Sequence, residues 1–139
     1  MAQLENNMNR DFVPSQQALA LKELGFDDEV LKVYDINSSK SKLYNYGEVL
    51  TGDDELYAPL YQQVFRWFRE KYDIQVSIQH WCKDSKIREY HYHIEYTYND
   101  TRHSTSSIAE HQYNMFNYEE AELECLKKLI EIVKENKNG

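Results

Sequence analysis

The chain has 139 residues, of which 41% are hydrophobic, 29% charged and 14% aromatic. Its four Gly and two Pro fall far below the average of roughly 12% combined, and this composition excludes collagen-like and low-complexity chains. A chain of this length buries about two-thirds of its unfolded surface on folding and needs no metal or disulfide for stability. The composition predicts one globular domain with long regular elements.

The net charge is −8, from 24 acidic and 16 basic residues. Because binding to a phosphate backbone requires a basic surface, we do not expect a nucleic-acid partner. No apolar run approaches the ~20 residues that span a bilayer, and residues 1–12 lack the apolar core of a secretory signal. Cys82 and Cys125 are not spaced like zinc ligands or a disulfide framework. We therefore expect a cytoplasmic protein with no cofactor and no membrane contact.

Residues 1–12 show no periodicity and are expected to form a flexible lead-in. A helix is predicted over Ser15–Leu24, with its first residue as the N-cap. Gly25 suits the left-handed position after the last turn, and Phe26 is expected to fold back onto Leu21 in a Schellman motif.

The next elements are shorter. The β-branched run Val30–Tyr34 predicts a strand, and Leu43–Tyr46 is a candidate for its partner across the polar turn Ile36–Lys42. Gly52–Glu55 is expected to be a surface loop. A strongly amphipathic helix follows over Pro59–Tyr72, with the proline at the first helical position.

Two alternating runs, Ile74–Lys83 and Ile87–Tyr98, predict a β-hairpin around a three-residue turn at 84–86. One register places all apolar side chains on one face and all polar side chains on the other, whereas a one-residue slip would mix them. The predicted apolar pairs are Ile78 with Tyr92, Val76 with Ile94, and Ile74 with Tyr96.

The last third of the chain is harder to interpret. The polar stretch Asn99–Ser107 is expected to be a mobile loop, and His111–Phe116 a short edge strand. A closing helix is predicted from Asn117, because Asn117 and Glu120 are spaced like a capping box. Residues 137–139 are expected to fray.

This order of elements predicts a single α+β domain spanning residues 13–136. Its two layers would be a small antiparallel sheet of about 3–5 strands and about three helices packed on one sheet face. The other sheet face would be solvated or would form a binding surface.

The strongest chemical candidate is the alternating trio His91, His93 and Glu95. On a strand these side chains share one face at roughly 7 Å spacing, and two imidazoles with a carboxylate are ligands for zinc or iron. A solvated sheet face explains the same alternation without any metal. We expect no metal and interpret the trio as part of a candidate binding surface. The full candidate set is Gln75, Ser77, Gln79, His91, His93 and Glu95.

A second arrangement is His80 with Cys82, two residues apart on the first predicted strand and on its core-facing side. Cys82 is a candidate nucleophile with His80 as its base. We favour the alternative of a small buried thiol beside a histidine at the edge of the core. Walker A, GxGxxG, GxSxG, HExxH and CxxC motifs are all absent from the sequence, and this absence weighs against an enzyme.

Three runs carry a resemblance to a known group of proteins. They are SQQALALKELGF at Ser15–Phe26, YAPLYQQVFRWFREKY at Tyr57–Tyr72 and NYEEAELECLKKLIEIVKE at Asn117–Glu135. Together they resemble a recurrent small protein of gut bacteria of the Bacteroides group, their phages and other mobile elements. The resemblance implies a mobile-element accessory protein, and the group has no assigned activity from which site residues could be transferred.

The favoured hypothesis is therefore a phage or mobile-element protein–protein interaction module that binds a host or phage protein. The 12 tyrosines suit an interface, because tyrosine gives contact area at low entropic cost. The alternatives are a small metal-dependent enzyme that uses His91, His93 and Glu95, and a structural or packaged virion protein. A homo-oligomer through a sheet edge at Val30–Tyr34 or His111–Phe116 stays open.

Overall fold

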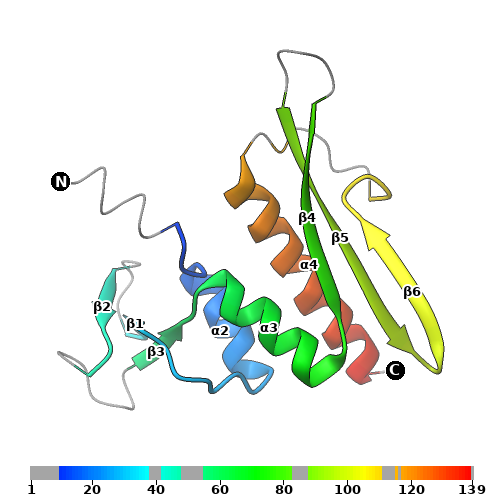
Figure 1. Cartoon of the computed structure of the whole chain (residues 1–139). Helices are drawn as coiled ribbons and strands as arrows, with labels where there is room; N and C mark the ends of the chain where they lie inside the picture. The colour runs from blue at the N-terminus through cyan, green and yellow to red at the C-terminus, as the bar shows by residue number, and fades with distance from the viewer. Residues whose placement is uncertain are drawn as a thin grey trace. The chain divides into compact units, whose positions relative to one another are not determined.

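The computed structural model describes residues 10–37, 42–47, 55–82, 88–110, 115 and 117–138 (Figure 1). The chain forms two compact units, residues 1–64 and residues 65–139. Its described part contains three helices and two three-stranded antiparallel sheets, which confirms the α+β class. The strands form two sheets rather than the expected one, and helix α3 separates the last strand of the first sheet from the first strand of the second along the chain. The single domain over 13–136 stays a prediction.

In the first unit, helix α2 spans Ser15–Glu23 and packs against strand β3. The predicted N-cap at Ser15 is wrong, because Pro14 occupies that position in an extended conformation with φ −60° and ψ 155°. The carbonyl of Pro14 accepts the first helical hydrogen bond, from the N–H of Ala18 at 2.8 Å. The proline ring already fixes φ near this value, so it presets the entry into the helix.

The predicted Schellman motif at the end of α2 is confirmed. The N–H of Phe26 donates to the carbonyl of Leu21, and the N–H of Gly25 donates to the carbonyl of Lys22, both at 3.0 Å. Gly25 adopts the left-handed conformation, with φ 98°. This conformation favours glycine because a Cβ atom would crowd the following carbonyl.

The first sheet has the order β2-β1-β3. Strand β1 (Lys32–Asp35) lies between β2 (Leu43–Asn45) and β3 (Glu55–Ala58), and both pairings are antiparallel. The partner strand at Leu43 is thus confirmed. The prediction that Val30–Tyr34 forms a sheet edge is wrong, because strand β1 pairs with a neighbouring strand on each side.

Strand β3 was not expected from the sequence. Glu55, predicted to lie in a surface loop, is the first residue of this strand, and residues 52–54 lie outside the described residues. The sheet is fastened to the preceding chain by a buried hydrogen bond from the hydroxyl of Tyr34 to the carbonyl of Val13, at 2.8 Å.

Helix α3 spans Tyr61–Tyr72, two residues later than Pro59 had suggested. Pro59 therefore precedes the helix, and its carbonyl accepts a hydrogen bond from the N–H of Val13 at 2.8 Å. The side chain of Gln63 caps the helix by accepting the N–H of Leu60 at 3.0 Å, as the third helical residue does in a capping box. Val64, Phe65, Trp67 and Phe68 are buried on this helix, as its amphipathic pattern predicts.

The second unit contains the sheet β4-β5-β6. Strand β4 (Gln75–Cys82) pairs with β5 (Arg88–Tyr98) in the predicted register, with Ile78 opposite Tyr92 and Val76 opposite Ile94. Ile94 is 0% and Tyr92 1% exposed, so the apolar face is the buried one. The expected turn at 84–86 lies outside the described residues.

The expected loop at Asn99–Ser107 is wrong, because Thr101–Ser106 form strand β6 beside β5. Asn99 and Asp100 make the connection with φ values of 51° and 59°. Two residues with positive φ form the turn that fits the twist of a hairpin, and Asn and Asp tolerate it well. Of the expected strand at 111–116 only Met115 is described, and its carbonyl accepts the N–H of Tyr90 at 2.8 Å.

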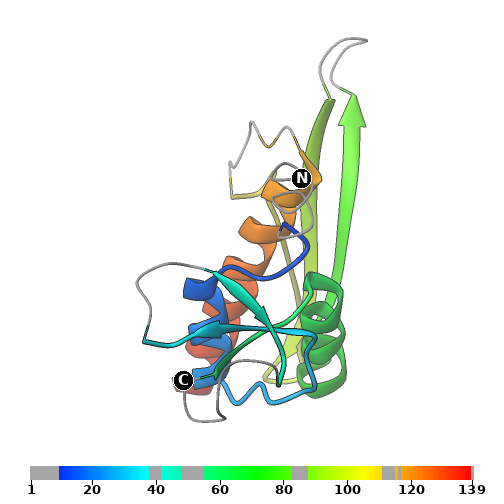
Figure 2. The same cartoon turned by 90° about the vertical axis from the view of Figure 1, so that its left-hand side faces the viewer.

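Helix α4 (Tyr118–Asn138) covers the face of this sheet that carries Tyr92 and Ile94 (Figure 2). The predicted cap at Asn117 is confirmed, because its side-chain oxygen accepts the N–H of Glu120 at 2.8 Å. The return contact differs from that of a capping box: the Glu120 carboxylate accepts the side-chain N–H of Asn117 at 2.9 Å, where a capping box uses the backbone N–H. The helix includes residues 137 and 138 of the segment expected to fray. In the described part of the chain, no helix is long and apolar enough to span a membrane.

The left-handed Gly25 gives a direct test of the α2 terminus. Replacing it with Ala is expected to lower the free energy of unfolding by about 1–2 kcal/mol, because the new Cβ meets the left-handed backbone. Replacing it with Asn is expected to cost less, because Asn tolerates this conformation. Urea unfolding of both variants measures the difference, and an equal cost for Ala and Asn would contradict this explanation.

Candidate functional site

The structure brings the six candidate binding residues together on one face of the β4–β5 hairpin. Three cross-strand pairs are formed: Gln75 with Glu95, Ser77 with His93, and Gln79 with His91. They alternate with the buried apolar pairs, so they lie on the sheet face opposite α4. We call these six residues the polar face. Its β4 members are exposed, whereas its β5 members are partly or fully buried.

Glu95 makes two contacts with basic side chains on the polar face. One carboxylate oxygen lies 3.3 Å from His93 Nε2, and the other accepts a hydrogen bond from Arg102 Nη2 at 3.2 Å. Arg102 also donates to the hydroxyl of Thr97, at 3.2 Å. The hydrogen bond from Arg102, with a further one from His93, lowers the pKa of Glu95 below its ordinary value. These contacts therefore favour the ionised form of the Glu95 carboxylate.

His91 differs from its neighbours because it is only 7% exposed. Its Nδ1 lies 3.0 Å from Ser107 Oγ, and its Nε2 lies 3.4 Å from a carboxylate oxygen of Glu89. The Trp81 ring lies edge-on to the imidazole, with the ring centroids 5.7 Å apart. The solvated face that the alternation predicts therefore ends at His91, where a buried polar cluster of Glu89, His91 and Ser107 begins.

Ser107 is the central member of this cluster and is fully buried. Its hydroxyl accepts the N–H of Tyr92 at 3.1 Å, and its own N–H donates to the Tyr92 carbonyl at 3.1 Å. The remaining hydroxyl proton is free to donate to His91, whose other N–H then points at Glu89. These contacts fasten the chain after β6 to the centre of β5.

The order serine, histidine, carboxylate is also the order of a hydrolytic triad. A nucleophile must reach its substrate, however, and Ser107 has no exposed surface. The cluster therefore has a structural role. Ser107 could not be predicted from the sequence, because its position depends on strand β6. The two-residue spacing of Glu89 and His91, which places both side chains on one face of β5, was the one sign of a polar cluster here.

The proposed metal trio does not converge on a common point. His91 directs its two ring nitrogens at Ser107 and Glu89, while Glu95 is engaged by His93 and Arg102. Among the described residues, no group of three or more His, Cys, Asp and Glu is arranged to hold a metal ion.

The two cysteines have opposite environments. Cys82 is exposed, so the interpretation of a small buried thiol is wrong for it. It lies at the end of β4 opposite Arg88, whose side chain is hydrogen-bonded to it. The ring of His80 lies 6.2 Å from the ring of Tyr90. Cys125 is buried in α4, and desolvation raises the pKa of its thiol far above the ordinary value. Burial therefore shields the Cys125 thiol from solvent and disfavours its reactive thiolate form.

Comparisons with protein-family models, with curated proteins and with solved structures found no match to this chain.

The buried cluster predicts a stability difference between two serines. Replacing Ser107 with Ala removes the hydroxyl that contacts the Tyr92 N–H and His91 Nδ1, and is expected to cost about 1–3 kcal/mol of unfolding free energy. Ser104, exposed on β6, is the matched control, and its replacement with Ala is expected to change stability by less than about 0.5 kcal/mol. Urea unfolding checks both, and equal losses would show that the cluster contributes nothing.

The pairing of Arg102 with Glu95 predicts a pKa change. Replacing Arg102 with Gln is expected to raise the pKa of Glu95 towards its ordinary value, as followed by NMR titration of the side-chain carboxyl carbons. Because the folded-state pKa is lowered, the stabilisation by this pair is present above the unfolded-state pKa. It is lost as the pH falls through the folded-state value.

The control for this titration is Arg66, which pairs with Glu70 on α3. Replacing Arg66 with Gln is expected to leave the Glu95 titration unchanged. If both variants shift Glu95 alike, the pKa reflects the net charge of the protein rather than its contact with Arg102.

Proposed function

We propose that the chain is a protein–protein interaction module and that strand β4 makes the principal contact. The observation that carries this proposal is the character of β4. It is an edge strand of eight residues, six of them exposed, and it contains no Asp, Glu, Lys or Arg. Trp81, near its end, is 55% exposed.

A long exposed edge strand is a liability that proteins usually protect with charge, proline or a bulge. Strand β4 has none of these, since its eight residues pair with β5 without interruption. Among the described residues its backbone pairs with β5 alone, so the opposite edge offers free N–H and C=O groups. The other edge strand, β6, carries the charged Arg102. These features support binding of a partner strand along β4.

The side chains of β4 supply the means of selecting a partner. Trp81 offers a large apolar surface with one hydrogen-bond donor, and tryptophan is enriched among residues that dominate binding energy. Gln75, Ser77 and Gln79 offer uncharged donors and acceptors beside it. The net charge of −8 favours a partner with basic surroundings.

The resemblance of three runs of the chain to proteins of phages and mobile elements supports an accessory role in such an element. On that proposal the partner is a host or phage protein in the cytoplasm. The alternatives of a metal-dependent enzyme and of a virion component have no comparable support among the described contacts.

A matched pair of charge variants tests the proposal. Gln79 lies on β4 and Gln62 lies on α3, and both are exposed. Replacing Gln79 with Lys places a charge on the edge strand and is expected to weaken partner capture at least tenfold, whereas Gln62→Lys is expected to have no effect. The readout is quantitative mass spectrometry of proteins purified with the tagged chain from its host, followed by cross-linking to map the contact.

A partner that is captured equally by wild type and both variants would contradict binding through β4. A chain that captures no protein reproducibly would overturn the interaction module itself.

A further inference from the structure

Strand β4 forms one edge of the second sheet, and the direction of its backbone groups follows from its neighbour β5 (Figure 1). Tyr92 of β5 uses both of its backbone groups on the far side, where Ser107 accepts its N–H and donates to its C=O, both at 3.1 Å. Ile78 lies directly opposite Tyr92. Opposed residues of an antiparallel pair direct their backbone groups either towards each other or both away. Ile78 therefore directs its N–H and C=O to the open edge.

Val76 and His80 direct their backbone groups to the same edge, because the direction alternates along a strand. Among the described residues, no backbone group outside the sheet bonds to these three residues. Their side chains lie on the face that α4 covers, where those of Val76 and Ile78 are only half-buried. An added strand would therefore satisfy the backbone groups and cover apolar surface at the same time.

The charges around β4 favour a second copy of this chain as the added strand. Because β4 contains no charged residue, two copies meet there without like charges in spite of the net charge of −8. Asp73 precedes the strand, and Arg88 lies opposite Cys82 at its other end, with its side chain hydrogen-bonded to Cys82. Both charged residues are exposed. Antiparallel pairing brings the beginning of one strand beside the end of the other, so each acid meets the base of the other copy.

We propose that β4 pairs antiparallel with β4 of a second copy of this chain, across a two-fold axis at Ile78. The two three-stranded sheets then form one sheet of six strands, joined through the same patch on both copies. The outward backbone groups of Val76, Ile78 and His80 all find partners, which gives about six hydrogen bonds. The facing side-chain pairs are Ile78 with Ile78, Val76 with His80, Ser77 with Gln79, and Gln75 with Trp81.

The charged groups select this register. It places Ile74 opposite Cys82 of the second copy, so Asp73 lies beside the strand end that Arg88 borders. A shift of two residues one way would place Asp73 opposite Trp81, and a shift the other way would carry it farther beyond the strand end. All of these groups belong to the second unit.

This inference rests on the proposed function, because it uses the same contact strand, and it adds regulation of that contact. An edge that is paired with a second copy is closed to any other strand. A partner protein therefore binds the separated copies, and the fraction of the chain that captures it falls as the concentration of the chain rises.

Exchange of the two charges tests the contact. Asp73→Lys and Arg88→Glu each bring like charges together at both ends of the dimer, and each is expected to raise its dissociation constant about tenfold. The double variant is expected to bind like wild type. Asp73 and Arg88 lie at opposite ends of an eight-residue strand, roughly 30 Å apart, so this rescue cannot arise within one chain. Analytical ultracentrifugation of the full chain over a concentration series gives the constants.

Asp28→Lys is the matched control, since Asp28 is exposed, lies outside the second unit and gives the same change in net charge. It is expected to leave the dissociation constant unchanged. Where Asp73→Lys does not fold, Asp73→Asn suits the φ of 54° at this position and is expected to weaken the dimer by a smaller factor. A chain that sediments as a monomer throughout, a double variant weaker than both single variants, or equal effects of Asp28→Lys and Asp73→Lys would overturn the proposal.

NMR of a mixture of isotope-labelled and unlabelled chains tests the register. Ser77 and Gln79 are roughly 7 Å apart along one strand but directly opposite each other between copies. A filtered nuclear Overhauser effect is therefore expected between their Hα atoms, which approach closely in such a pair. Contacts between copies in another register, or through another surface, would contradict pairing at Ile78.

The two proposals for β4 fail separately. A monomeric chain that captures a protein in a manner sensitive to Gln79→Lys overturns the dimer and supports the interaction module. A dimer that responds to the charge exchange, in a chain that captures no other protein, supports the pairing and overturns the module.

Discussion

The pairing of β4 with β5 is the constraint on which the second unit depends. Once Val76 lies opposite Ile94, strand alternation assigns every neighbouring side chain to one of two faces. The apolar face is then available to α4, and the polar side chains are aligned in facing pairs on the other side. A slip of one residue would bury Gln and His under the helix, so the cost of desolvating polar groups maintains the register.

The elements that could be predicted are those whose signal is local. The Schellman motif at Gly25, the N-cap at Asn117 and the β4–β5 register each follow from residues a few positions apart or from simple alternation. Strands β3 and β6 were missed for a shared reason. Glu55 begins a strand next to acidic loop residues, and β6 is composed of Ser, Thr, Arg and His, so tertiary pairing rather than local preference decides their conformation.

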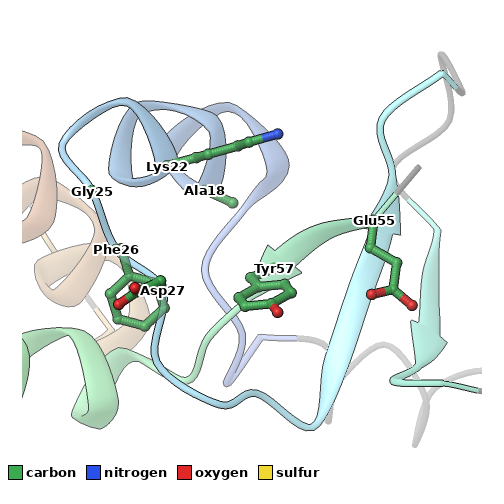
Figure 3. A pocket seen from close by; sticks show the side chains of 7 residues that line it. All are labelled: Ala18, Lys22, Gly25, Phe26, Asp27, Glu55 and Tyr57. Atoms are coloured by element: carbon green, nitrogen blue, oxygen red, sulfur yellow. The ribbon is translucent and has the colours of Figure 1, made fainter. Parts of the chain in front are cut away.

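The candidate sites also differ in whether a local sequence pattern or tertiary pairing determines them. The polar face could be predicted because Gln75, Ser77 and Gln79 alternate in step with their partners on β5. The burial of His91 could not, since it depends on Ser107, which is 16 residues away and positioned by an unexpected hairpin. The structure also contains a pocket that is lined by residues of α2 and β3, among them Lys22 and Glu55 (Figure 3). This pocket could not be predicted either, because strand β3 was not expected from the sequence.

The contrast between the two cysteines has a practical consequence. Cys82 is exposed at the end of the open edge strand, whereas the thiol of Cys125 is buried and held protonated. A thiol-directed fluorophore or spin label will therefore attach at one position without any engineered cysteine. That position lies next to Trp81, so the label reports on the environment of β4 and changes its signal when another chain approaches this edge.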